Sequence, residues 1–114
     1  MEIGELLEDG ILVLRPAGRI NNDSSPDFQA RLLAWVDSND AVVIDLASVE
    51  YISSAGLRAL MMASRRAKAR GGRIAVAALS PLVQEVFTIS RFDQVVQVFD
   101  TAADACGAMH SART

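Results

Sequence analysis

The sequence predicts a single α/β domain, in which right-handed crossovers build a mostly parallel sheet of five strands with an initial antiparallel hairpin and about four helices. Short apolar strand patterns alternate with amphipathic helix patterns along most of the chain. The dipeptide Asp9-Gly10 separates the first two strand candidates and is typical of a hairpin turn. With 114 residues, of which 51% are hydrophobic, the chain is long enough for one core, so we expect one domain over residues 1–114.

The strand candidates are apolar runs of strand length. Residues 2–8 and 11–16 are expected to form the hairpin, and the polar residues 18–25 that follow are expected to form a loop. Val42-Val43-Ile44 is a continuous apolar run, which indicates a central strand that is covered on both faces. This central strand is expected to cover residues 41–46, and two later strands are expected at 73–78 and 95–99.

The helix candidates begin at capping signals. Pro26 suits the first turn of a helix, with Ser24 or Ser25 as its cap, and Ser80-Pro81 offers the same pair of residue types to a later helix. A further helix is expected between the helix at Pro26 and the helix at Pro81, and the glycine pair at 71–72 is expected to end it. The predicted helices cover residues 26–37, about 54–70, a short stretch from 81, and 101 to about 110.

Composition excludes several classes of partner and location. The net charge of −3, with acidic and basic residues intermixed, gives no broad basic field, which argues against nucleic acid or an anionic membrane as the main partner. Cys106 is the only cysteine, so no internal disulfide can form. Residues 1–5 are acidic where a secretory signal is basic, and no apolar run approaches the roughly 20 residues that span a bilayer. We expect a cytoplasmic protein without membrane insertion.

The sequence carries no recognisable catalytic, metal or cofactor motif. Neither serine of the central segment has the glycine two residues before it that a nucleophile elbow needs, and the only histidine is His110, near the C-terminus. There is no phosphate-binding loop that ends in Gly-Lys-Ser/Thr and no cluster of histidine and cysteine. We therefore expect a binding protein with no enzymatic activity, no metal and no cofactor.

The segment of residues 51–57, Tyr-Ile-Ser-Ser-Ala-Gly-Leu, joins an apolar strand pattern to the first turn of an amphipathic helix. Two hydroxyl groups, those of Ser53 and Ser54, therefore stand where backbone amides are still free. Such a serine is most often only a helix cap. A phosphorylated serine would also be stabilised there by N–H donors and by the positive end of the helix dipole. The segment therefore suits a phosphate switch.

The order of these motifs resembles the STAS family, the domain of sulphate transporters and anti-sigma factor antagonists. The resemblance rests on the strand at 42–46, the segment 49–57 and the helix that ends at Gly71-Gly72. It extends to Gly18-Arg19-Ile20-Asn21 after the second strand and to residues 80–87 at the third helix. A free-standing domain of this length is most similar to the bacterial anti-sigma factor antagonists.

The resemblance implies a function and a phosphoacceptor. In those antagonists a serine at the start of the second helix is phosphorylated by a partner serine kinase that is itself the anti-sigma factor. The family pattern is an acid, the acceptor serine, a small residue, glycine and leucine, which assigns the acceptor to Ser54. Ser53 stands in the acid's place and Asn21 where an aspartate is frequent, so the surface around Ser54 is less acidic than in the sporulation-type members.

The resemblance also implies a partner switch. The unmodified form binds the anti-sigma kinase and frees a sigma factor, phosphorylation of Ser54 releases the kinase, and a metal-dependent serine phosphatase reverses the modification. The expected partner surface consists of Asn21, Asn22, Ser53, Ser54, Ala55, Gly56, Arg58 and Met62.

Two kinds of alternative remain open at this point. Gly56 could simply fit a crowded helix crossing, Arg58 could belong to a solvated face, and Met62 could be a partly covered surface residue. The rival function is a non-phosphorylated accessory subunit of a membrane transport complex that moves phospholipids, with the same helix as a constant docking face.

Overall fold

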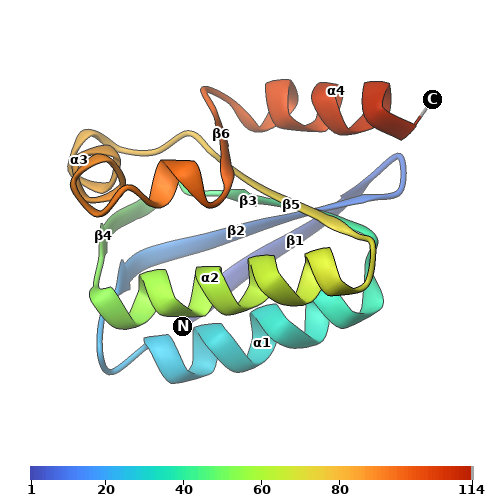
Figure 1. Cartoon of the computed structure of the whole chain (residues 1–114). Coiled ribbons are helices and arrows are strands. Elements are labelled where there is room, and N and C mark those ends of the chain that lie inside the picture. Colours follow the sequence, from blue (N-terminus) through green and yellow to red (C-terminus); the bar gives the residue numbers. More distant parts are fainter. Residues whose placement is uncertain (114) are drawn as a thin grey trace.

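The computed structural model describes residues 1–113, with side chains described for residues 1–110. Strands and helices alternate along this part of the chain after an initial pair of strands (Figure 1). The elements are β1 (Glu2–Glu8), β2 (Ile11–Ile20), α1 (Ser25–Ser38), β3 (Ala41–Asp45), β4 (Val49–Ile52), α2 (Ser54–Ala69), β5 (Arg73–Ala77), α3 (Pro81–Ser90), a 3-10 turn (Phe92–Gln94), β6 (Gln97–Phe99) and α4 (Ala102–Arg113).

The strands form one mixed sheet in the order β1-β2-β3-β5-β6, and β4 pairs with β2 outside this path. Only β1 and β2 run antiparallel, and the other pairs are parallel. The hairpin turn has positive φ at both central residues, 49° at Asp9 and 83° at Gly10, as its sequence predicts. The predicted α/β fold with an initial antiparallel hairpin is therefore confirmed.

The structure adds a strand that the sequence analysis does not predict. β4 is only four residues long and includes the exposed Glu50, so it has neither the length nor the apolar run of a typical strand signal. Its pairing partner is the end of β2, with Gly18 opposite Val49 and Ile20 opposite Ile52. The expectation of a loop from residue 18 is therefore wrong for residues 18–20, because these residues are held by β4.

The helices cover the two faces of the sheet unequally (Figure 1). α1 and α2 lie side by side on one face, α4 lies across the other, and α3 contacts β4 at one end of the molecule. β3 supplies both cores, since Val42 and Ile44 face α1 and α2 while Val43 faces α4. The prediction that β3 is covered on both faces is confirmed. Among residues 1–113, no helix combines the length and the apolar character that crossing a bilayer requires.

Cys106 lies buried on α4 against the smaller core. Burial raises the pKa of its thiol above the ordinary value, and the nearby Glu8 carboxylate raises it further. Because the thiolate is the reactive form, we expect alkylation of Cys106 by iodoacetamide at pH 8 to be at least about tenfold slower in the native protein than in the unfolded chain. Mass spectrometry over time measures both rates, and equal rates would contradict the buried placement.

Candidate functional site at the start of α2

Ser53 is the N-cap residue of α2, and its side chain makes the capping hydrogen bond. Its backbone is extended, with φ −87° and ψ 173°, and its Oγ accepts a hydrogen bond of 3.2 Å from the backbone N–H of Gly56. The backbone N–H of Ser53 donates in turn to the carbonyl of Ile20, over 2.8 Å. Ser53 is only 8% exposed. Its hydroxyl therefore satisfies a free amide of the first turn and is turned away from solvent.

Ser54, one residue further, is exposed in the first helical turn. Within the part of the chain that the structure describes, its hydroxyl makes no hydrogen bond. The two neighbouring serines are thus different in kind. One hydroxyl caps the helix from within, and the other is reachable from solvent at the positive end of the helix dipole.

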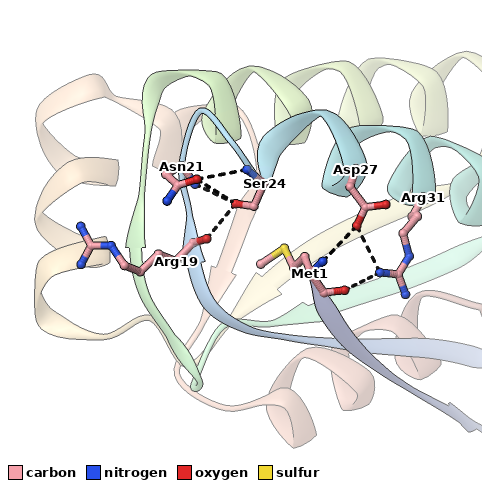
Figure 2. A network of polar contacts seen from close by, with 6 residues as sticks. All are labelled: Met1, Arg19, Asn21, Ser24, Asp27 and Arg31. Carbon is pink, nitrogen blue, oxygen red and sulfur yellow. Dashed lines mark hydrogen bonds and ion pairs between the residues drawn. The ribbon is translucent and has the colours of Figure 1, made fainter.

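The loop between β2 and α1 is shaped by Asn21 (Figure 2). Its side-chain oxygen accepts from the backbone N–H groups of Asp23, at 2.9 Å, and Ser24, at 3.0 Å. Ser24 Oγ donates to the carbonyl of Arg19, over 2.8 Å, and accepts from the backbone N–H of Asn21. Ser24 stands at the N-cap position of α1, but its side chain makes no capping bond. The expectation of Ser24 or Ser25 as the cap is confirmed in position, since Ser24 is the N-cap residue, but its hydroxyl makes no capping bond because the loop itself engages it.

The two segments meet because β2 pairs with β4. Ile20 lies opposite Ile52 at the end of this parallel ladder, so the next residues, Asn21 and Ser53, leave the sheet together. α1 and α2 then start at the same end of the molecule and run side by side (Figure 1). Between their first turns lies an open hollow of about 500 Å³. Its lining comprises Asn22, Ser25, Pro26, Gln29 and Ala30 from the α1 side, and Ala55 and Arg58 from α2.

The predicted partner residues differ in how they meet this surface. Asn22, Ser54, Arg58 and Met62 are exposed, and Asn21 and Ala55 are half-buried. Met62, which is 37% exposed, lies about two turns along α2 from Ser54.

Gly56 is buried beneath the helix, and an added Cβ would stand 2.7 Å from Ile20 Cγ2 and from Ile52 Cγ1. The missing side chain therefore allows close approach of α2 to β2 and β4. Gly56 therefore has the packing role that the sequence analysis gives as an alternative to a role on the partner surface.

Two positions where the chain differs from the STAS pattern keep their hydrogen bonds and lose only charge. An aspartate in place of Ser53 would cap α2 with the same kind of acceptor oxygen, and an aspartate in place of Asn21 would accept the same two loop amides. The local shape therefore needs an acceptor, which serine and asparagine both supply. Neither position therefore adds a carboxylate near Ser54.

Pro26 and Gln29 on the rim of the hollow are not among the residues predicted from sequence. They belong to the first turns of α1, and only the packing of α1 beside α2 brings them to the site. No local pattern in the sequence marks this neighbourhood. Arg19 likewise stacks over the Tyr51 ring at 4.9 Å and supports the β2–β4 pair next to the site.

Comparison with known proteins identifies the family. A family model described as "Mlab, STAS domain" matches residues 6–97. The chain belongs to the STAS domain family. This confirms the resemblance drawn from the strand at 42–46 and the segment at 49–57. The matched residues include Ser54.

One sequence relative and three solved structures place this STAS domain among similar proteins. A Bordetella bronchiseptica protein named "Putative anti-sigma factor antagonist BtrV" is 34% identical over 105 residues, which cover 91% of this chain and 90% of that protein. An anti-sigma factor antagonist from Mycobacterium paratuberculosis has a TM-score of 0.82 at 30% identity, over 94% of this chain and 93% of the other. Unphosphorylated SpoIIAA, an anti-sigma factor antagonist, has a TM-score of 0.80 at 16% identity, over 96% and 97%. The phosphorylated form of Bacillus SpoIIAA gives 0.71 at 15% identity, over 95% and 99%.

Proposed function

We propose that this STAS domain is an anti-sigma factor antagonist whose binding to its partner is controlled by phosphorylation of Ser54. Two relatives at 30% identity or more carry names of that class, over nine-tenths of the chain. The observation that carries the proposal is the contrast between two adjacent hydroxyls. Ser53 Oγ is engaged as the cap of α2, whereas Ser54 is exposed in the first helical turn, beside a hollow whose lining includes Arg58.

The unmodified surface offers a partner small uncharged groups, such as Ser54 and Ala55, together with the guanidinium of Arg58. Phosphorylation adds between about −1.5 and −2 charges at pH 7, together with three acceptor oxygens. On its own helix this charge is favoured by about 0.3 to 1 kcal/mol, because it meets the N-terminal end of the dipole. At a packed interface the same group must lose its water and find room, which costs affinity. Modification therefore releases the partner without refolding the domain.

The shared fold of the two SpoIIAA forms supports the proposal that phosphorylation does not refold the domain. SpoIIAA has been solved unphosphorylated and phosphorylated, and both forms match this chain over most of its length. In our proposal the partner is an anti-sigma factor with serine kinase activity, which the unmodified antagonist occupies so that a sigma factor is freed. A metal-dependent serine phosphatase restores the unmodified form. The domain itself is a cytoplasmic binding protein without catalytic activity.

The test is phosphorylation by the cognate kinase. Incubated with the kinase and ATP, the wild-type chain should gain the mass of one phosphate, and Ser54→Ala should gain none. Ser53→Ala is the matched control, because it keeps Ser54 as the acceptor and loses only the cap. It should still be modified while its stability falls by about 0.5 to 2 kcal/mol. Modification of Ser54→Ala, or none of the wild type, would contradict the proposal.

The rival role makes a different prediction at the same surface. A constant docking face on a membrane transport complex would bind equally well with Ser54→Asp and with the wild type. Genes for a serine kinase and a serine phosphatase beside this one favour the switch, whereas transporter genes favour the subunit. Co-purification with a transporter that is insensitive to substitution of Ser54 would support the rival.

A further inference from the structure

We propose that Arg58 binds the phosphate of phosphorylated Ser54 within the same chain, so that modification also withdraws this guanidinium from the partner surface. The inference rests on the proposed function and deepens it. It makes Arg58 a positioning residue for the phosphoryl group rather than a passive member of a solvated helix face.

The first argument is the spacing on α2. Ser54 and Arg58 are four residues apart, so they are neighbours on one face of the helix, and both are exposed. Side chains of an α-helix lean toward its N-terminus, which tilts Arg58 toward the turn that holds Ser54. An anion followed four residues later by a cation is also the more favourable order for such a pair.

The second argument is that Arg58 is uncommitted. Among the residues that the structure describes, Arg58 has no ion pair and no hydrogen bond to its side chain. Two other arginines of α1 and α2 are engaged, since Arg66 Nη1 lies 3.1 Å from Asp37 and Arg31 Nη1 lies 3.3 Å from Asp27. α2 carries no acidic residue of its own. A new negative charge at Ser54 would therefore not compete with an existing partner of Arg58.

The third argument is the space around the pair. Arg58 lines the hollow between the first turns of α1 and α2, where about 500 Å³ is open to solvent. Two acids stand at the neighbouring end of α1. Asp27 is paired with Arg31 and with the N-terminal amine of Met1, and Figure 2 shows its carboxylate pointing toward these two residues. Asp23 is exposed in that loop. A phosphate can be held here without displacing a protein group.

The pairing gives the switch a second component. In the unmodified chain Arg58 is a free cation next to the docking surface and favours a partner with acidic groups opposite it. In the modified chain the phosphate holds the guanidinium back, so the partner loses an attractive contact at the moment it meets a repulsive one. Both effects act in the same direction on affinity.

The test uses the full chain with phosphoserine genetically encoded at position 54, which requires no kinase. Titration by ³¹P NMR measures the second pKa of the phosphate, near 6 for phosphoserine without close partners. A nearby guanidinium stabilises the dianion, so Arg58→Gln should raise this pKa by roughly half a unit. Arg58→Lys should restore most of the difference. Arg65→Gln is the matched control, because Arg65 shares the exposed face but lies about 10 Å further along the helix axis, and it should leave the pKa unchanged.

A phosphate pKa in Arg58→Gln equal to that of the wild type would overturn the proposal, and so would an equal rise in Arg65→Gln, since that would indicate only a general field. Thermal unfolding of the unphosphorylated variants checks that the fold is intact, as expected for exposed arginines. The measurement is separable from the proposed function. If no kinase modifies Ser54, the switch fails while the titration still reports whether Arg58 holds a phosphate there.

Discussion

Ser54→Asp should lower the affinity of the chain for its anti-sigma partner by about tenfold or more, since each 1.4 kcal/mol of lost binding energy corresponds to a factor of ten. The carboxylate adds one negative charge at an exposed position that a docked partner must cover, and the charge then has to lose its water. Within the domain the charge sits at the start of α2, where the helix dipole stabilises it. The loss should therefore appear in binding and leave the stability of the free domain unchanged or slightly raised.

Ser54→Asn is the control for this substitution. Asparagine has nearly the same shape as aspartate and no charge, so it separates electrostatic from steric effects. We expect it to bind within a few-fold of the wild type. Isothermal titration calorimetry with the partner measures both variants, and thermal unfolding shows that both are folded. Equal losses for the two variants would assign the effect to size, and the electrostatic account of release would then be wrong.

Gly56→Ala should destabilise the domain by about 1 to 3 kcal/mol, the usual range for a methyl group forced into a filled core. The new Cβ would stand 2.7 Å from Ile20 Cγ2 and from Ile52 Cγ1. Both isoleucines are almost completely buried, at 0% and 1% exposure, so they have little room to move. α2 must then shift away from β2 and β4. Helix propensity alone predicts the opposite sign, because alanine is favoured over glycine by about 1 kcal/mol in a helix.

Gly107→Ala supplies the matched control, since Gly107 lies in α4 and an added Cβ there would meet nothing within 4 Å. With no clash, only the higher helix propensity of alanine acts, and the free energy of unfolding should rise by up to about 1 kcal/mol. Urea unfolding of the two variants beside the wild type gives the comparison directly. A stabilised Gly56→Ala would mean that α2 is not seated on Ile20 and Ile52 as the structure has it.

Local sequence signals predict most of the architecture. The Asp9-Gly10 turn, the apolar run of β3 and the serine–proline start of α3 depend on neighbours in the chain, and the structure has each of them. Ser80 Oγ accepts from the backbone N–H of Val83, as a capping serine should. The position of Ser54 in the first turn of α2 is local in the same way, because the amphipathic helix pattern begins there and Ser53 caps it.

Contacts between distant segments account for the rest. The four residues of β4 are a strand because the end of β2 pairs with them, and that pairing also converts residues 18–20 from a polar loop into strand. The 3-10 turn at Phe92–Gln94 shortens the last strand to Gln97–Phe99, although the apolar residues start at Val95. Neither feature has a periodic pattern in the sequence, since both depend on which backbone groups happen to lie opposite.

The order of strands and helices apart from β4, the resemblance to the family, and the placement of two hydroxyls at the start of α2 all follow from the amino-acid sequence alone. They depend on periodicity and capping, which act over a few neighbouring residues. Packing in three dimensions was needed to show that Ser53 is committed and Ser54 exposed, that Gly56 faces Ile20 and Ile52, and that Arg58 lines a hollow beside α1. The reason is that burial and free space are properties of packed surfaces, and those surfaces are brought together by residues far apart in the chain.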